Sequence, residues 1–192
     1  MDLIFATHNL HKLTEVKMLL PESINLLSLS DVNYTSEINE TETTLEGNAL
    51  LKAQTIFNHT QINCFADDSG LLVDALNGAP GVYSARYAGE QKNDEDNLQK
   101  LLKKLNGIEN RKAHFKTVIA LVLNNKSYSF EGIINGTIIT EKKGGHGFGY
   151  DPIFMPDGYS KTFAELSLAE KSAISHRAIA VKKLVTFLDS CF

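Results

Sequence analysis

The sequence predicts an α/β fold of the mixed α+β kind, arranged around one central mixed β-sheet. Strand-like and helix-like segments alternate over the first part of the chain, and strand-like segments then cluster between residues 114 and 135. No internal repeat, low-complexity segment or linker interrupts the 192 residues, a length that suits one domain with a full core. We therefore expect a single domain that covers residues 1–192.

The chain begins with a strand–turn–helix unit. The apolar run at residues 3–6 is typical of a buried strand, and apolar residues then recur at helical spacing until Pro21 ends the pattern. The elements expected up to residue 70 are a strand at 3–6, a turn at 7–9, a helix at 10–20, a strand at 26–29, an acidic loop at 30–44, a helix at 45–58 and a strand at 62–66 that ends in Asp67-Asp68-Ser69-Gly70.

The rest of the chain contains the longer strands. Pro80 and three glycines mark residues 77–90 as an ordered loop or short turns, and leucines at helical spacing follow it. The elements expected here are a helix at 94–105, strands at 114–123 and 128–135 joined by a hairpin turn at 124–126, a further short strand at 136–140, a glycine-rich segment at 143–152 and a last helix at 176–188.

Composition excludes several classes of partner. The net charge is −4 and the pI is about 5.9, so the chain lacks the basic field with which proteins grip nucleic acid. No segment is long and apolar enough to span a membrane, and the N-terminus does not read as a signal peptide. Cys64 and Cys191 have no metal-finger spacing, which favours two free thiols in a reducing cytoplasm. We expect a cytoplasmic protein with neither a nucleic-acid nor a membrane partner.

The turn at residues 7–12 is a candidate anion site. A turn between a strand and a helix presents backbone N–H groups and the positive end of the helix dipole, and both favour an anion. The residues in it are Thr7, His8, Asn9, Leu10, His11 and Lys12. The alternative is that Asn9 caps the helix and Lys12 lies on a solvated face.

The adjacent carboxylates Asp67 and Asp68 are a candidate catalytic pair. Successive side chains of a strand point to opposite faces, so only one needs to face a site while the other caps a nearby turn. A carboxylate there can hold Mg²⁺ or accept a proton from water, and a glutamate of the acidic loop, among Glu37, Glu40 and Glu42, can be a second metal ligand. The alternatives are a turn stabilised by its own Asp and Ser side chains, and a solvated acidic loop.

Two later segments are candidates for binding a flat ligand. Glycines at 144–149 allow close backbone approach, and Phe148 and Tyr150 can stack on a base, unless they belong to the core. Lys171, His176 and Arg177 gather at the start of the last helix, where Ser175 is a good N-cap. Cations at a helix start oppose its dipole, which indicates that they serve a ligand rather than the helix, although a solvated basic face is the alternative.

Taken in order, these motifs resemble one known family over nearly the whole chain. The chain is similar to the Ham1-type inosine/xanthosine triphosphate pyrophosphatases. The segments that carry the resemblance are residues 7–12, EGNALLKA at 46–53, FADDSGL at 65–71, GAPGVYSARY at 78–87, GFGYDPIF at 147–154, and EKS at 170–172 with SHR at 175–177.

The resemblance implies an elongated, two-lobed fold with a nucleotide-binding cleft, a homodimer, and Mg²⁺-dependent cleavage of inosine or xanthosine triphosphates to a monophosphate and pyrophosphate. It implies that Asp68 is the catalytic carboxylate and, with Glu40, a metal ligand. It further implies that the nucleotide contacts Thr7, His8, Asn9, Leu10, His11, Lys12, Lys52, Ser69, Phe148, Gly149, Tyr150, Asp151, Lys171, His176 and Arg177.

The chain departs from the family pattern at two places. His8 stands where the turn often carries glycine, which tightens backbone access. The acidic loop reads Asn39-Glu40-Thr41-Glu42 where the family typically has Glu-Glu-Thr-Gly. Glu40 is our choice for the second metal carboxylate, but a strict alignment places Asn39 there, with Glu37 as a substitute.

These assignments suggest a mechanism in which water, deprotonated by Asp68 or by a metal-bound neighbour, attacks the α-phosphorus while metal and Lys12 neutralise the leaving pyrophosphate. Donors such as Lys171, His176 and Arg177 would pair with a 6-oxo purine and be left unpaired by a 6-amino purine. The rival hypotheses are a pyrophosphatase for pyrimidine or methylated nucleotides and a nucleotide-binding regulator that does not hydrolyse.

Overall fold

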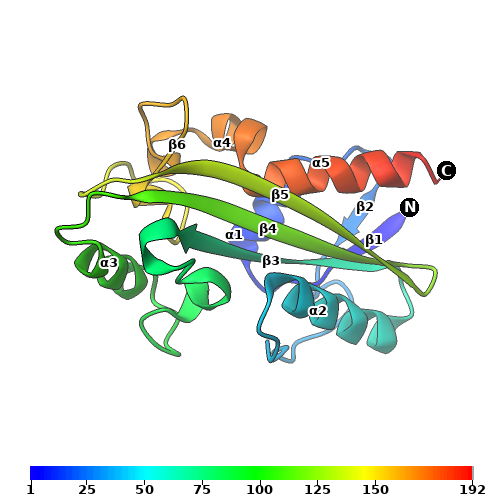
Figure 1. The fold of residues 1–192 in the computed structure, drawn as a ribbon. Helices are drawn as coiled ribbons and strands as arrows, with labels where there is room; N and C mark the ends of the chain where they lie inside the picture. The colour runs from blue at the N-terminus through cyan, green and yellow to red at the C-terminus, as the bar shows by residue number, and fades with distance from the viewer. Residues whose placement is uncertain (192) are drawn as a thin grey trace. The chain divides into compact units, whose positions relative to one another are not determined.

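The structure, a computed structural model, describes residues 1–191 and has a mixed α/β architecture (Figure 1). Its sheet has six strands in the order β2-β1-β3-β4-β5-β6. β1 pairs in parallel with both β2 and β3, whereas β5 and β6 are antiparallel. The predicted fold class, helices combined with one mixed sheet, is confirmed.

The element bounds are as follows. The strands are β1 (Asp2–Phe5), β2 (Asn25–Leu27), β3 (Cys64–Val73), β4 (Lys112–Leu123), β5 (Lys126–Ile138) and β6 (Phe154–Pro156). The α-helices are α1 (Leu10–Lys17), α2 (Leu45–Thr60), α3 (Asp94–Lys104), α4 (Leu168–Ile174) and α5 (His176–Asp189). Short 3₁₀ helices lie at Asp74–Leu76, Gly81–Arg86, Asp151–Ile153 and Phe163–Glu165.

The chain divides into two compact units, each assembled from segments that are distant in sequence. The first unit contains residues 1–68, residues 117–132 and the C-terminal segment that begins at Arg177. The second unit contains residues 69–116 and 133–176. The description of the chain as one domain stays a prediction.

The first unit packs helices on both faces of its strands. Side chains alternate along β1 and β3, so Phe5 and Phe65 face the same side, where their rings stack with centroids 4.6 Å apart. Val16 of α1 and the apolar stripe of α5 complete this buried cluster. Cys64 faces the other side, where its thiol donates to the Ala53 carbonyl of α2 at 3.0 Å. Figure 1 shows α5 and α2 on opposite faces of the strands, so residues of β3 meet side chains from different helices on their two faces.

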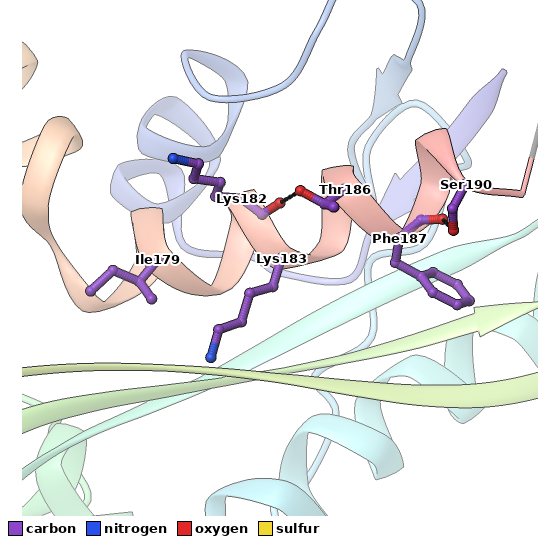
Figure 2. Close-up of a pocket in the computed structure, with 6 residues that line it drawn as sticks. All are labelled: Ile179, Lys182, Lys183, Thr186, Phe187 and Ser190. Atoms are coloured by element: carbon purple, nitrogen blue, oxygen red, sulfur yellow. Dashed lines mark hydrogen bonds between the residues drawn. The ribbon is translucent and has the colours of Figure 1, made fainter.

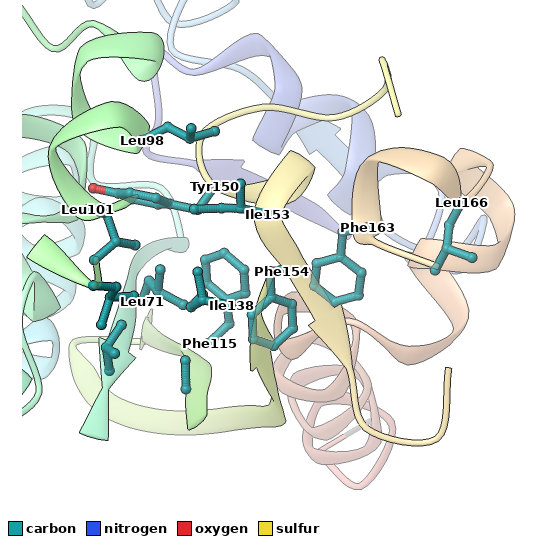
Figure 3. Close-up of a cluster of buried hydrophobic side chains, with 13 residues drawn as sticks. Leu71, Leu98, Leu101, Phe115, Ile138, Tyr150, Ile153, Phe154, Phe163 and Leu166 are labelled. Carbon is teal, nitrogen blue, oxygen red and sulfur yellow. The ribbon is translucent and has the colours of Figure 1, made fainter. Parts of the chain in front are cut away.

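The second unit is held together by a separate apolar cluster, drawn in Figure 3. Phe154 is central to it, because its ring lies 4.7 Å from that of Phe115 and 5.1 Å from that of Phe163, measured between centroids. The buried leucines of α3 belong to the same cluster, and α3 itself confirms the helix predicted there. The same cluster receives Tyr150 and Ile153 from the glycine-rich segment and so fixes that segment.

The structure corrects the predicted end of the third strand. β3 does not stop at the two aspartates but continues to Val73, and Leu71 and Val73 are fully buried. Adjacent carboxylates read as a strand end because unpaired charge is costly inside a sheet. Both carboxylates have cationic partners here, so the strand continues through them.

Three other elements differ from the prediction. Lys171 lies in a separate short helix, α4, and not at the start of the last helix, and Ser175 ends α4 directly before α5 begins at His176. The strand predicted at 136–140 is the end of β5, and β6 was not predicted.

The hairpin at 124–126 is confirmed, since Asn124 and Asn125 have φ values of 50° and 62°, as a tight two-residue turn requires.

Two expectations about the chain as a whole can be compared with the structure. Across residues 1–191, none of the helices has both the length and the apolar composition needed to cross a membrane. Cys64 is buried and Cys191 is exposed, and both are free, as predicted. Burial raises the pKa of the Cys64 thiol to about 12, so this thiol stays protonated and unreactive at neutral pH.

Candidate functional site

The predicted anion-binding turn connects β1 to α1 and is ordered by its own side chains. The Asn9 side chain caps α1 by accepting hydrogen bonds from the backbone N–H groups of His11 at 3.0 Å and Lys12 at 3.2 Å. The backbone N–H of Asn9 in turn donates to the Thr7 hydroxyl at 3.1 Å. The capping alternative is therefore confirmed for Asn9, and the turn is fixed before any ligand arrives.

Lys12 does not lie on a solvated face, so that part of the alternative is wrong. Its ammonium donates to Oδ1 of Asp67 at 2.9 Å, and its side chain is only 15% exposed. Burial lowers the pKa of Lys12, and the charges of Lys52 and Arg177 lower it further, whereas Asp67 raises it. The ammonium of Lys12 at the end of the turn is therefore held in place by the Asp67 carboxylate of β3.

Asp67 and Asp68 point to opposite faces of β3, as the alternation predicts. Asp67 does not cap a turn, because Arg177 of α5 donates from Nε to its Oδ2 at 3.1 Å while Lys12 occupies Oδ1. Arg177 also pairs through Nη1 with Glu15 of α1. With 1% exposure, Arg177 is buried among carboxylates, and its contact with a nucleotide stays a prediction.

Asp68 meets α2 and the acidic loop on the other face. Lys52 donates to Oε1 of Glu40 at 2.6 Å and to Oδ1 of Asp68 at 3.5 Å. Asn48 reaches Oδ2 of Asp68 at 3.4 Å and also accepts from the backbone N–H of Glu42 at 3.0 Å, which ties the loop to α2. Glu40 is therefore the loop carboxylate placed beside the same ammonium as Asp68, whereas Glu37 and Asn39 are exposed.

The two neighbouring carboxyl groups have pKa values displaced in opposite directions. Burial alone would raise the pKa of Asp67, but the charges of Lys12 and Arg177 hold it well below its usual range. Burial raises the pKa of Asp68, and Lys52 and Lys12 only partly oppose this. This contrast is expected when one carboxylate, here Asp67, stabilises the fold through ion pairs and the other, here Asp68, takes part in proton transfer.

The Glu40–Asp68 pair fits a magnesium site. Among residues 1–191 no group of three or more His, Cys, Asp or Glu side chains could hold a metal ion. Mg²⁺ needs only one or two carboxylates when waters and substrate phosphates complete its shell. The donors present are hard oxygens that already share one cation, Lys52, so their chemistry suits Mg²⁺.

The second unit contains the other predicted residues, organised by Asp151. Its Oδ2 accepts from the Lys171 ammonium at 2.6 Å and from the backbone N–H of Phe148 at 2.9 Å. The Lys171 ammonium lies 5.0 Å from the centroid of the Phe148 ring. Gly147 has a φ of 77°, and a Cβ there would come within 2.0 Å of the Asp151 carboxylate. Only glycine therefore allows the loop to wrap this closely around Asp151.

Of the remaining candidates, His176 stacks on Phe115 with ring centroids 4.6 Å apart, and its side chain is buried. Ser69 is half-buried in β3, and the backbone N–H of Gly149 donates to Asp94 at 2.7 Å. Tyr150 belongs to the core, as the alternative for the aromatic residues proposed. A ring buried in the core is not placed to stack on a base, so Phe148 is the better candidate for stacking.

Replacing Tyr150 by phenylalanine tests this core assignment. The Tyr150 hydroxyl donates to the Ser84 carbonyl at 2.9 Å, and its loss should cost about 1–1.5 kcal/mol of the free energy of unfolding. For a chain of this size we expect the melting temperature to fall by roughly 2–6 °C. The control is Tyr159→Phe, at an exposed tyrosine. Equal melting temperatures for Tyr150→Phe and wild type would contradict the assignment.

A surface hollow of about 530 Å³ lies along α5, apart from all of these residues. Its lining is drawn in Figure 2, where Lys183 and Phe187 extend from α5 toward the strands and Lys182 points away. The hollow contains none of the predicted site residues, so it does not enter the candidate site.

The sequence reasoning missed several residues that organise the site. Glu15 pairs with Arg177, Asn48 links the acidic loop to Asp68, and the Ser84 carbonyl accepts the hydrogen bond of the Tyr150 hydroxyl. A signal existed for Glu15, which follows Lys12 by one helical turn on the same face of α1. No comparable local signal exists for Asn48 or Ser84, because their partners lie 20 and 66 residues away.

Comparisons with known proteins agree with these motifs. The sequence model of the Ham1 family matches residues 3–187. The chain is 54% identical over 190 residues to the dITP/XTP pyrophosphatase of Flavobacterium psychrophilum, covering 99% of this chain and 100% of that one. It is 46% identical to the dITP/XTP pyrophosphatase of Bacillus subtilis, covering 98% of both. The solved Ham1 protein of Staphylococcus aureus superposes with a TM-score of 0.91 at 40% identity, over 100% of each chain.

Proposed function

Because this chain belongs to the Ham1 family, we propose that it hydrolyses abnormal purine nucleoside triphosphates, namely ITP, dITP and XTP, to the monophosphate and pyrophosphate with Mg²⁺. Such an activity removes these nucleotides from the pool. The observation that supports it most directly is the contrast between two neighbouring carboxylates. Asp67 is paired with two cations, whereas Asp68 lies beside Lys52 and Glu40 and has a pKa that burial raises. The names of the relatives, dITP/XTP pyrophosphatase, agree with it.

The first unit supplies the groups for the triphosphate. Asp68 accepts the proton of the attacking water. Asp68 and Glu40 would hold Mg²⁺, which would supply positive charge to the phosphates. Lys12 and Lys52 neutralise the charge that develops on pyrophosphate as it leaves. The capped turn at residues 7–12 fixes Lys12 at the start of α1, where the helix dipole also favours phosphate.

A separate group of residues is proposed for the base. Phe148 offers a ring face, and the Lys171 ammonium lies next to it, held by Asp151. Lys171 and His176 act as donors to the 6-oxo group of hypoxanthine or xanthine. A 6-amino group has a donor where these residues need an acceptor, so adenine would leave buried polar groups unpaired. Ser69 and the backbone of 148–151 complete this part of the proposal.

A substrate panel tests the proposal. We expect release of pyrophosphate from dITP to be favoured over release from dATP by at least about a hundredfold in kcat/KM, since a site built for hydrogen bonding rejects a mismatched edge strongly. The release should require Mg²⁺ and stop when a chelator is added. The measurement is a coupled pyrophosphate assay with dITP, XTP, dATP, dUTP and a methylated nucleotide.

The outcomes of this panel separate the rival hypotheses. Equal turnover of dITP and dATP would remove the argument from the 6-oxo group. Preference for dUTP or the methylated nucleotide would favour the pyrimidine or methylated-nucleotide pyrophosphatase. Tight nucleotide binding without turnover would favour a regulator.

The proposal also includes a homodimer that acts in the cytoplasm. The dimer follows from the family resemblance, and the cytoplasm from two free cysteines, one of them buried and unreactive. Light scattering during gel filtration measures the dimer directly. A monomer at micromolar concentration would remove the dimer from the proposal without affecting the chemistry.

A further inference from the structure

A row of four charged side chains lies in the first unit, next to the Glu40–Asp68 pair but not part of it. Lys12 and Glu15 come from α1, Asp67 from β3 and Arg177 from the first turn of α5. The contacts run from Lys12 to Asp67, from Asp67 to Arg177, and from Arg177 to Glu15. Because Lys12 and Glu15 are one turn apart on the same helix, the row begins and ends on α1.

The row is buried and its charges balance. The side chains of Asp67 and Arg177 are 1% exposed and that of Glu15 is 7% exposed, whereas Lys12, at 15%, is the most exposed member. Two cations face two carboxylates, so removal of one charge leaves another without compensation in a place where solvation is weak. The positions of all four groups are therefore coupled, and the end that can reach a ligand is Lys12.

We propose that Glu15 is a positioning residue for phosphate binding, which acts through Arg177 and Asp67 to hold the Lys12 ammonium in place. Glu15 retains Nη1 of Arg177 while Nε of the same guanidinium holds Oδ2 of Asp67. Oδ1 of Asp67 then remains on Lys12. The inference rests on the proposed function in one respect, namely that Lys12 binds phosphate.

Replacing Glu15 by glutamine shows how the row works. The amide keeps the shape of the side chain but removes one negative charge, so Asp67 becomes the only carboxylate of the row. A guanidinium readily forms bidentate hydrogen bonds with a single carboxylate. Arg177 is expected to turn onto both oxygens of Asp67 and to displace Lys12, which then loses its fixed position.

The test is a double-mutant cycle read by calorimetric binding of inorganic tripolyphosphate, which requires no catalysis. Glu15→Gln should weaken binding by about tenfold, a usual size for coupling within one charged network. In the Lys12→Met background the same substitution should cause no further loss, because Glu15 acts through Lys12. An additive loss, as from general damage to the fold, would overturn the inference, and so would unchanged binding by Glu15→Gln.

Two further measurements keep the test decisive. A crystal structure of Glu15→Gln should show the Lys12–Asp67 contact lengthened beyond about 4 Å, and a retained contact overturns the inference. If Glu15→Gln does not fold, Arg177→Lys replaces it, because one ammonium cannot bridge both carboxylates as a guanidinium does. The surface control is Glu22→Gln, at an exposed glutamate.

The proposed function and this inference fail separately. A wild-type protein that binds tripolyphosphate with the predicted dependence on Glu15, yet releases no pyrophosphate from dITP, refutes the enzyme and supports the positioning role. If the wild-type protein hydrolyses dITP but Glu15→Gln does not change the binding of tripolyphosphate, the enzyme is supported and the positioning role of Glu15 is refuted.

Discussion

Asp68→Asn is expected to lower kcat for dITP hydrolysis by about 10²–10⁴-fold, the usual loss when a general base is removed. The amide cannot accept the proton of the attacking water, and it is a weaker ligand for Mg²⁺ than a carboxylate. The side chain keeps its shape between Asn48 and Lys52, so the fold should survive. Steady-state pyrophosphate release, with the melting temperature of each variant, measures both effects.

The control for this variant is its neighbour in β3. Asp67→Asn leaves Arg177 and Lys12 with one fewer buried negative charge, so it should lower the free energy of unfolding by about 3–5 kcal/mol. Asp68→Asn should cost much less stability and far more activity. If the two variants lost activity and stability in parallel, the division of roles between the two aspartates would be refuted.

The pH dependence of stability offers a second view of the Asp68→Asn variant. The pKa of Asp68 in the folded protein is raised, chiefly by burial, above the ordinary aspartate value of 3.8. Such a group favours the folded state below its unfolded pKa, and that contribution is lost as pH rises through the folded pKa. The wild type should therefore lose stability relative to Asp68→Asn as pH rises from about 4 to neutrality, which denaturant titrations at several pH values measure.

The elements of this fold could be predicted because their signals are local. Apolar residues at helical spacing marked α3, and a two-residue asparagine turn marked the β4–β5 hairpin. The predicted third strand ends before Asp67, whereas β3 continues to Val73, because the contacts that allow this are not local. The cations that compensate the charge of Asp67, Lys12 and Arg177, lie 55 and 110 residues away, so no local pattern reveals them.

In the candidate site, too, the sequence indicates some features and not others. Motifs indicated that Asp68, Glu40 and Lys52 matter, and the structure places the carboxylates of Asp68 and Glu40 beside the Lys52 ammonium. The motifs did not indicate the direction in which a side chain points. Arg177 resembles a nucleotide ligand in sequence, yet it is buried between Glu15 and Asp67, and Tyr150 resembles a stacking ring yet donates to Ser84 within the core.

Lys52→Met should have a large effect on stability, and that effect should depend on metal. The ammonium lies between Glu40 and Asp68, and its removal leaves two part-buried carboxylates without their cation. Loss of one partner from a buried ion pair costs about 3–5 kcal/mol. At neutral pH and without metal, we expect the free energy of unfolding of Lys52→Met to fall by up to about this amount. The loss should shrink as pH falls, since Lys52 no longer opposes the raised pKa of Asp68 and protonation relieves the repulsion.

Mg²⁺ is expected to restore much of this stability, because a divalent ion held by Glu40 and Asp68 supplies the charge that Lys52 provides in its absence. Calorimetric melting with increasing Mg²⁺ should raise the melting temperature of Lys52→Met more than that of the wild type. Lys103→Met, at an exposed lysine of α3, is the matched control and should respond as the wild type does. If Mg²⁺ raised all three melting temperatures equally, these carboxylates would not be the metal site, and the metal would have to be held by other groups.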